Sequence, residues 1–125
     1  IKVLDVMQKE AAKLGRHVDL LLQVHIAEEA TKFGFDPTEL KAVADPQVWT
    51  RYPNLSPVGL MGMATFTDDT AQVAREFGGL RQLFESHGAE RNWNTLSMGM
   101  SGDWRIAVDQ GSTMVRIGSA IFGSR

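Results

Sequence analysis

The stretch that decides the fold is LSMGMSGDWRIAVDQGSTMVRIGSAIFGSR (residues 96–125). It predicts a short alternation of elements: strand 94–98, helix 103–109, strand 113–117 and a helical stub at 121–125. A small-residue loop follows each strand directly, Gly99–Asp103 after the first and Arg116–Ser119 after the second. Strands that alternate with helices indicate a parallel sheet with right-handed crossovers.

The same alternation extends back to the start of the chain. In chain order, the predicted elements before residue 94 are helix 2–14, strand 18–26, a helix from Asp36, strand 55–64 and a helix capped by Thr67–Asp69. Gly15 is a natural stop for the first helix, and Asp36-Pro37 supplies an N-cap followed by a proline at the first helical position. One helix followed by four strand–helix units predicts an α/β fold, half of a (β/α)8 barrel.

The apolar residues predict which faces are buried. In helix 2–14 one buried stripe is expected from Val3, Leu4, Val6, Met7, Ala11 and Leu14. Strand 18–26 is almost continuously apolar, which predicts cover on both faces. The inner face of the helix after Asp69 is expected to be Val73, Phe77, Leu80, Leu83 and Phe84.

Composition excludes several classes of protein. The net charge is −2 and the basic residues are scattered, so we expect no nucleic-acid partner. Apolar runs such as Val18–Leu22 are too short to span a bilayer, so no membrane association is expected. Cysteine is absent, which favours a cytoplasmic location, and the histidines show no metal-ligand spacing. Because the chain opens at Ile1, we expect it to be a piece of a longer protein.

The two loops at the end of the chain can build a phosphate site. Ser101 offers a hydroxyl, and Gly102 lets backbone N–H groups approach an anion at a helix start. Gly118 and Ser119 can complete the cup with their amides, and Arg116 is a rigid planar donor for a ligand's ring or phosphate. Loops after the last two strands of (β/α)8 barrels often hold a phosphate. Taken alone, Gly–Ser loops are also ordinary turns, and the spacing leaves both interpretations open.

Three motifs carry a resemblance to a known family. Segment 96–125 resembles the closing signature of the YggS/PROSC family, the pyridoxal phosphate homeostasis proteins. QVHIAEEATKFGF (23–35) and PVGLMGMATFTDD (57–69) resemble two further segments of that family. The resemblance implies a TIM barrel of fold type III that binds pyridoxal 5'-phosphate (PLP) and is related to the N-terminal domain of alanine racemase. It implies that residues 1–125 supply about four βα units, the C-terminal half of the barrel.

The resemblance also implies the cofactor-binding residues: Ser101, Gly118 and Ser119 at the phosphate, Arg116 near the pyridine nitrogen, and Met61 and His25 at strand ends facing the ligand. His25 stands where many members have asparagine, and Ser119 where many have threonine. The family's Schiff-base lysine lies on an N-terminal strand that nothing here matches, so it is expected outside this chain. The lysines present are Lys2, Lys9, Lys13, Lys32 and Lys41, and we assign none of them, nor any other residue, a catalytic role.

Three functions follow for comparison. The resemblance implies a non-catalytic protein of intracellular PLP homeostasis that buffers the cofactor, and the sequence leaves open whether it is delivered to apo PLP-dependent enzymes. The alternative is a PLP-dependent amino-acid racemase, which needs two opposed acid/base groups. Tyr52, the single tyrosine, lies on a predicted helix, and we expect no second domain within residues 1–125; both points count against a racemase. The third is a bare half-barrel, whose two open strand edges would drive association unless the N-terminal half were supplied.

Overall fold

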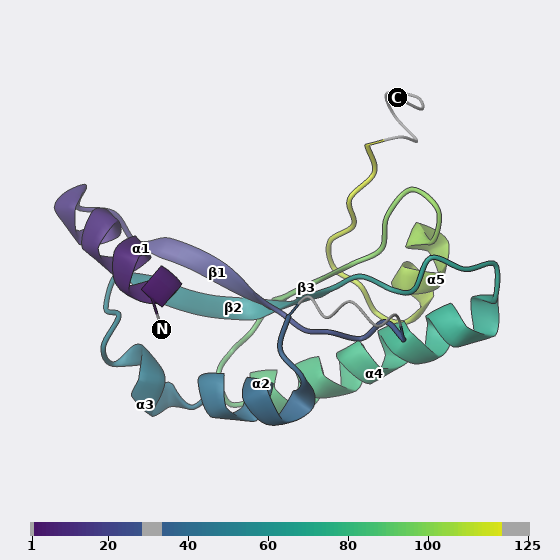
Figure 1. Ribbon diagram of the computed structural model, residues 1–125, viewed down its shortest axis with the longest axis horizontal. Coiled ribbons are helices and arrows are strands. Elements are labelled where there is room, and N and C mark those ends of the chain that lie inside the picture. The colour runs from purple at the N-terminus through teal and green to yellow at the C-terminus, as the bar shows by residue number, and fades with distance from the viewer. Residues whose placement is uncertain (1, 29–33, 119–125) are drawn as a thin grey trace.

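The computed structural model describes residues 2–28 and 34–118 of the chain (Figure 1). In chain order its elements are α1 (Lys2–Lys13), β1 (Val18–Gln23), α2 (Pro37–Val43), α3 (Pro46–Trp49), β2 (Leu55–Gly62), α4 (Thr70–Gly88), β3 (Thr95–Met98) and α5 (Trp104–Asp109). The predicted alternation of helices and strands is confirmed up to α5. No helix in the described ranges is long and apolar enough to cross a membrane.

The three strands form one parallel sheet in the spatial order β1-β2-β3. Each strand is added beside the previous one, as in a barrel wall, whereas the order of a doubly wound sheet reverses at one point. The β1–β2 register shifts between Leu20 and Leu21, beside Pro57, which has no N–H to contribute to the ladder. Only glycine fits at Gly59, because a Cβ there would lie 1.6 Å from the carbonyl oxygen of Thr95.

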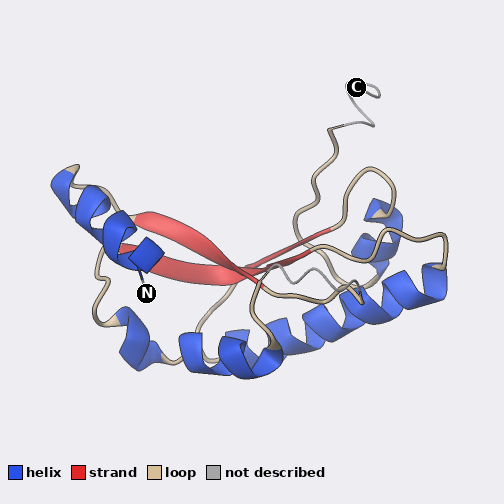
Figure 2. Cartoon of the chain, in the orientation of Figure 1, coloured by secondary structure: helices blue, strands red, loops and turns tan. Residues whose placement is uncertain are grey.

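The main hydrophobic core lies between the sheet and the helices that cover one of its faces, with α4 as the longest (Figure 2). Its largest fully buried side chains are Phe77, Leu40, Leu60, Leu80, Leu96, Met98 and Val24. The inner face predicted for α4 is confirmed: Val73 is buried too, and Leu83 and Phe84 pack against the core. Removal of this apolar surface from water is what holds α4 on the sheet.

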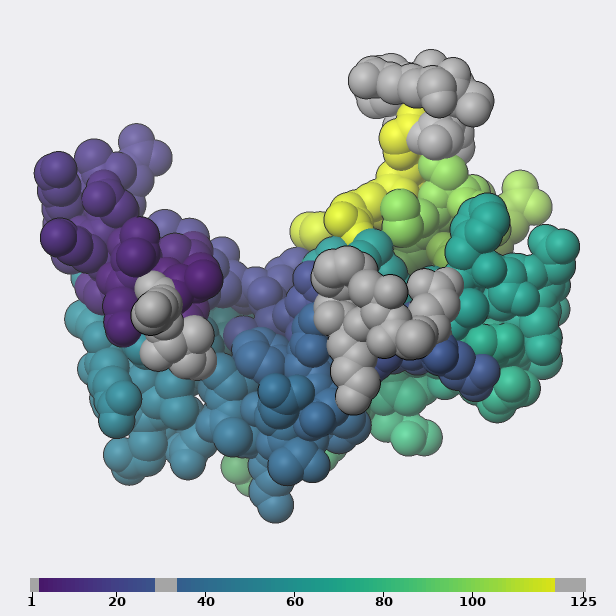
Figure 3. Space-filling view, viewed as in Figure 1, coloured from purple at the N-terminus to yellow at the C-terminus, as the bar shows by residue number. Residues whose placement is uncertain are grey.

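The opposite face of the sheet is less covered than the sequence predicts. The buried side chains of this segment face α4: Leu22 in β1 and Val24 just after it. Asp19, on the opposite face, is exposed. The prediction that this strand is covered on both faces is therefore wrong for the described part of the chain. Figure 3 shows the molecule hollowed above this face, between α1 and the segment that follows α5. Leu21, Gln23 and Met61 are only half-buried on this face, whereas Ser97 on β3 is buried.

Helix α1 packs on the amino-terminal end of the sheet through a second, smaller cluster. Leu4 and Ala11 are buried in it with Tyr52 and Leu55, and the Tyr52 hydroxyl donates a 3.0 Å hydrogen bond to Asp5. The predicted stripe is too wide, however, because three of its members are largely exposed: Val3 at 66%, Val6 at 63% and Leu14 at 66%. A helix advances about 100° per residue, so contact with one neighbouring surface buries only the line through Leu4 and Ala11.

The helix starts follow their capping residues. Asp36 and Glu39 form a reciprocal capping box at the start of α2, with Pro37 in its first turn, and Asp69 caps α4 by accepting from the N–H of Gln72. The short helix α3 is missing from the sequence-based prediction. Its Asp45 accepts from the N–H of Gln47 just ahead of a proline helix start. This start repeats the Asp-Pro signal of α2, so the sequence did contain the information.

The strand predicted at 113–117 is not formed, and within the described residues the sheet has three strands. A single parallel bridge joins Ser97 to Met114. Two side chains take main-chain groups of β3 that a ladder would use: Thr113 Oγ1 accepts from the N–H of Leu96 at 2.7 Å, and Ser112 Oγ donates to the carbonyl of Met98 at 2.7 Å. Main-chain bonds complete the bridge, from the N–H of Met114 to the Leu96 carbonyl at 3.2 Å and from the N–H of Met98 to the Met114 carbonyl at 3.1 Å. The pairing does not continue as a regular fourth strand, and the chain then leaves the sheet (Figure 1).

Candidate functional site

A row of side chains crosses the open face of the sheet near its carboxyl end. The register pairs Gln23 with Met61 and Met61 with Ser97, and the bridge continues the row to Met114. Side chains alternate between the two faces of a strand, so the row lies opposite the buried Leu60. Because all three strands are parallel, their following loops meet at this same edge. Ligand sites of (β/α)8 proteins are built at that edge.

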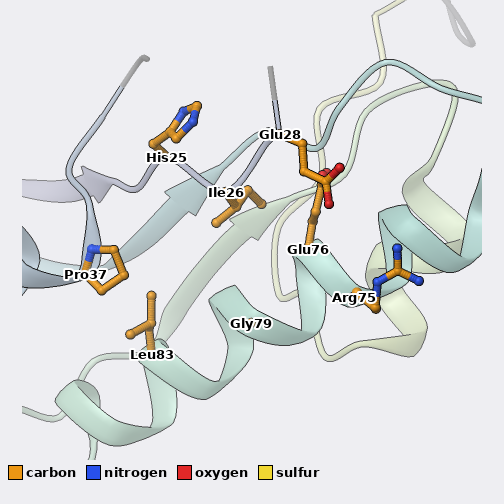
Figure 4. A pocket seen from close by; sticks show the side chains of 8 residues that line it. All are labelled: His25, Ile26, Glu28, Pro37, Arg75, Glu76, Gly79 and Leu83. Atoms are coloured by element: carbon orange, nitrogen blue, oxygen red, sulfur yellow. The ribbon is translucent and has the colours of Figure 1, made fainter. Parts of the chain in front are cut away.

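His25 lies two residues beyond Gln23 and therefore on the same face. Figure 4 shows its ring directed away from α4, whereas Ile26 beside it packs into the core. His25 and Met61 thus share the open face at the carboxyl end, in half-buried positions. That arrangement is compatible with the ligand-facing role expected of both.

The two loops predicted to hold a phosphate are adjacent. The N–H of Arg116 donates to the carbonyl of Gly99 at 2.9 Å, which places the segment after α5 directly against the loop after β3. Ser101 is half-buried in the first loop, while Arg116 and Gly118 are exposed in the second. Ser119 lies outside the described residues. The main-chain contact thus brings the start of the second segment to the loop that carries Ser101, at one corner of the carboxyl edge.

The first loop is closed by its own aspartate. Asp103 Oδ1 accepts from the N–H of Met100 at 2.8 Å, and the N–H of Asp103 donates back to the carbonyl of Met100 at 3.2 Å. The amide of Met100 is therefore engaged, and the Asp103 carboxylate brings negative charge to the start of α5. An anion bound here would therefore take its hydrogen bonds from the other N–H groups of the loop and from the second segment. This set of donors is smaller than the one that the sequence suggests.

A buried glutamate that the sequence analysis missed reaches the same edge from α4. Glu76 is 8% exposed, and it accepts from the N–H and the hydroxyl of Thr65, each at 2.7 Å. Gln72 Nε2 donates to it at 3.1 Å, and the hydroxyl of Thr65 also accepts from the N–H of Glu28 at 2.9 Å. A charged residue at the helical spacing of Val73 and Leu80 was the sequence signal that could have revealed it.

A hollow of about 440 Å³ lies at the carboxyl edge between α4 and the segment after β1, and it reaches His25 beside the row. It is lined by His25, Ile26, Glu28, Pro37, Arg75, Glu76, Gly79 and Leu83 (Figure 4). It faces α4, so it does not coincide with the adjacent loops around Ser101 and Arg116. Residues 29–33 follow Glu28 directly and lie outside the described part, and we therefore assign the hollow no ligand.

A grouping of serine, histidine and aspartate at the amino-terminal end of the sheet is not a catalytic triad. His17 Nε2 lies 2.7 Å from Ser56 Oγ and 3.8 Å from an Asp19 carboxylate oxygen. Both contacts involve the same ring nitrogen, whereas a triad needs the acid on the other one. In the described residues no group of three or more His, Asp or Glu side chains is arranged to hold a metal ion.

Three lysines of the described residues are exposed on helices, and the tyrosine is buried at the amino-terminal end of the sheet. Lys9, Lys13 and Lys41 are exposed on helices, and Lys32 is outside the described residues. Tyr52 is buried against α1, and its hydrogen bond to Asp5, followed by burial, raises the pKa of the phenol above its usual 10.0. A phenol used as an acid/base group at neutral pH needs the opposite shift.

The family model for the N-terminal domain of alanine racemase matches residues 1–125. The chain belongs to this family. Two relatives in it are named pyridoxal phosphate homeostasis proteins: that of Aquifex aeolicus is 35% identical over 97% of this chain, and that of Vibrio alginolyticus is 41% identical over 86%. The chain spans about half the length of these relatives, 53% and 46% respectively.

Two solved structures of PipY from Synechococcus elongatus are also similar to this chain. PipY of Synechococcus elongatus without PLP superposes with a TM-score of 0.84 at 31% identity, over 98% of this chain and 57% of PipY. PipY with PLP bound gives a TM-score of 0.76 at 31% identity, over 93% of this chain and 54% of PipY. The fold is therefore of the TIM-barrel-like α/β class that this family shares.

Proposed function

We propose that this chain forms part of a PLP-binding protein of intracellular PLP homeostasis. The observation that carries the proposal is the likeness, over 93% of the chain, to PipY with PLP bound. The names of the Aquifex aeolicus and Vibrio alginolyticus relatives support the same function. The adjacent loops at the carboxyl edge supply a place for the cofactor that agrees with this likeness.

The residues present fit the groups of PLP. The hydroxyl of Ser101 and the amides around Gly118 and Ser119 would hold the phosphate, which needs several hydrogen-bond donors at one place. Arg116 would lie at the pyridine nitrogen and keep it unprotonated, because a guanidinium does not give up its proton. Met61 and His25 would face the ring from the open side of the sheet. When bound, PLP supplies an aldehyde and an electron-accepting ring, and an unprotonated ring nitrogen weakens the latter.

The finer architecture belongs to the same proposal. Residues 1–125 would supply about four βα units, the C-terminal half of a barrel, with the segment after α5 completed as a strand by the other half. The lysine that binds the aldehyde would come from that other half. The N-terminal half is therefore the proposed structural partner, and apo PLP-dependent enzymes are the proposed recipients of the cofactor in the cytoplasm. The absence of cysteine supports that location.

The alternative function, an amino-acid racemase, has less support. It needs a second acid/base group opposite the lysine. Tyr52 is engaged with Asp5 at the amino-terminal end of the sheet, and its raised pKa makes it a poor proton carrier. We therefore propose a protein that holds the cofactor without a catalytic cycle of its own.

The test uses the full-length protein that contains this chain. Titration with PLP is expected to give a saturable change in the visible absorbance of the cofactor. Borohydride is expected to fix the cofactor to a lysine outside residues 1–125, as located by peptide mass spectrometry. Absence of saturable binding, or labelling of a lysine within this chain, would contradict the proposal. Pairing Ser101→Ala with Gly118→Val should weaken the binding of PLP, and unchanged affinity would count against the phosphate site.

A further inference from the structure

A continuous set of hydrogen bonds joins three elements at the carboxyl edge of the sheet. It runs from the N–H of Glu28, after β1, to the hydroxyl of Thr65, after β2, and on to the Glu76 carboxylate on α4. The N–H of Thr65 binds the other oxygen of the same carboxylate. Two loops that follow neighbouring strands are thus held to one buried side chain.

The chemistry of the groups fixes the direction of these bonds. An ionised carboxylate only accepts, so the single hydroxyl proton of Thr65 must point to Glu76. The hydroxyl oxygen is then left as the acceptor for the N–H of Glu28. A glutamine at position 76 would place an amide N–H₂ against the hydroxyl or against the side-chain N–H₂ of Gln72, and one donor would be left unpaired. The set therefore requires an acid at this position.

The cost of burying the Glu76 carboxylate indicates that this residue does more than fill the core. A carboxylate removed from water is costly unless hydrogen bonds compensate for its lost solvation. Glu76 lies in the helical stripe between Val73 and Leu80, where an apolar side chain would add to the core without that cost. In the described part of the chain its partners, Thr65 and Gln72, are hydrogen-bond donors, and neither of the ion pairs found there involves it. What the acid provides in return is a fixed position for Thr65.

The two loops that Thr65 connects flank the open face near the expected ring of the cofactor. The first carries His25, three residues before Glu28, and the second follows the strand that carries Met61. The loops around Ser101 and Arg116 lie beyond β3, on the other side of the site. The hydrogen bonds therefore act on the ring side and not on the phosphate side.

We propose that Glu76, acting through Thr65, is a positioning residue that holds the ring side of the cofactor site in its binding geometry. The inference rests on the proposed PLP-binding function and deepens it. Glu76 touches no cofactor in this scheme. It sets the loop at Glu28 against the loop at Thr65, and so fixes the separation of His25 and Met61 before the ligand arrives.

The test compares four variants of the full-length protein by titration with PLP and with pyridoxal, which lacks the phosphate. Glu76→Gln and Thr65→Val are expected to weaken the binding of both ligands by the same factor, about tenfold. The affinity ratio of PLP to pyridoxal should stay at the wild-type value, because the phosphate loops are untouched. Thr65→Ser keeps the hydroxyl and should bind like the wild type. Glu85→Gln, the same substitution on the exposed side of α4, should also bind like the wild type.

Loss of stability is separated from loss of positioning by Val73→Ala. This buried residue on the same helix makes no contact with the loops by hydrogen bonding, so its removal should lower the melting temperature and leave the affinity at permissive temperature unchanged. Wild-type affinity in Glu76→Gln and Thr65→Val, or failure of Thr65→Ser to restore binding, would overturn the inference. So would a change in the ratio of PLP to pyridoxal affinity.

Amide exchange of ligand-free protein tests the same contact without the cofactor. The N–H of Glu28 is expected to exchange faster in Thr65→Val than in Thr65→Ser, while amides within β2 keep their protection. Equal exchange of Glu28 in both variants would overturn the inference. If the two variants differ in this way but the wild-type protein binds no PLP, the proposed function is contradicted and the contact is not, so the two failures are distinguishable.

Discussion

Replacement of Gly99 by alanine is expected to be the most damaging small change near the proposed phosphate site. Gly99 has a φ of +107°, a conformation that residues with a Cβ rarely adopt. An added Cβ would lie 2.7 Å from the Ala107 methyl and 3.1 Å from Val115 Cγ1. The backbone strain contributes about 1–3 kcal/mol and the overlap about 1–3 kcal/mol. Together they predict a loss of about 2–6 kcal/mol in the free energy of unfolding.

Binding should fall with it, because the carbonyl of Gly99 holds the N–H of Arg116. A shift of Gly99 moves the two phosphate loops relative to each other, so PLP should lose more affinity than pyridoxal. The assays are urea unfolding of the full-length protein and titration with both ligands. For the unfolding measurement, Gly102→Ala is the matched control in the same loop, since a Cβ there would meet no atom within 4 Å. Equal stabilities of Gly99→Ala and Gly102→Ala would refute the reasoning.

A second variant keeps the test informative if Gly99→Ala does not fold. Combining Gly99→Ala with Ala107→Gly removes the 2.7 Å overlap and leaves the φ strain. The double variant should therefore be more stable than the sum of the two single losses in free energy of unfolding predicts. The difference should be about 1–3 kcal/mol, the part of the loss that comes from the overlap. Additive effects of the two substitutions would show that the Ala107 methyl does not set the cost.

The remaining predictions concern the core and two titrating groups. Phe77→Ala should lower the free energy of unfolding, measured with urea, by about 3–5 kcal/mol, since the ring is fully buried. A loss no larger than that of a surface substitution would contradict the burial of this ring in the core. Tyr52→Phe removes the hydrogen bond to Asp5. Because the pKa of Tyr52 is raised in the folded protein, the wild type keeps this stabilisation below pH 10.0 and loses it as pH rises further. The free energy of unfolding of the variant should not show this loss. Burial, and then Arg91, lower the pKa of His87, so the wild type should be fully stabilised above the usual value of 6.5 and lose stability as pH falls below it. His87→Gln should flatten that slope in thermal unfolding, and an unchanged slope would exclude His87 as its source.

Local signals in the sequence were sufficient for most of the fold. Asp36 and Asp69 mark helix starts through bonds made within one turn, and such signals depend on no distant residue. The β-branched, apolar strands were predictable for the same reason. Helix α3 carries an equally local signal at Asp45 and is simply short.

Errors arose where the outcome depends on a neighbour that the sequence pattern does not name. Residues 113–117 have the composition of a strand, yet their pairing with β3 is limited to one bridge at Met114, and the side chains of Ser112 and Thr113 also bond main-chain groups of β3. Val3 and Val6 have helical spacing with Leu4, but burial depends on how wide a surface faces α1. Periodicity predicts that a face is apolar and does not predict what covers it.

The two sides of the proposed site differ in the same way, and this difference makes them separable by experiment. The phosphate side depends on glycine conformation and on loops that follow consecutive elements, so Ser101 and Gly118 could be proposed from sequence. The ring side depends on Glu76 meeting Thr65, 11 residues away, and on Thr65 meeting Glu28, 37 residues away. No local pattern encodes those distances. Because the two sides are built by different residues, substitution at Gly99 should change the ratio of PLP to pyridoxal affinity, and substitution at Glu76 should lower both affinities together.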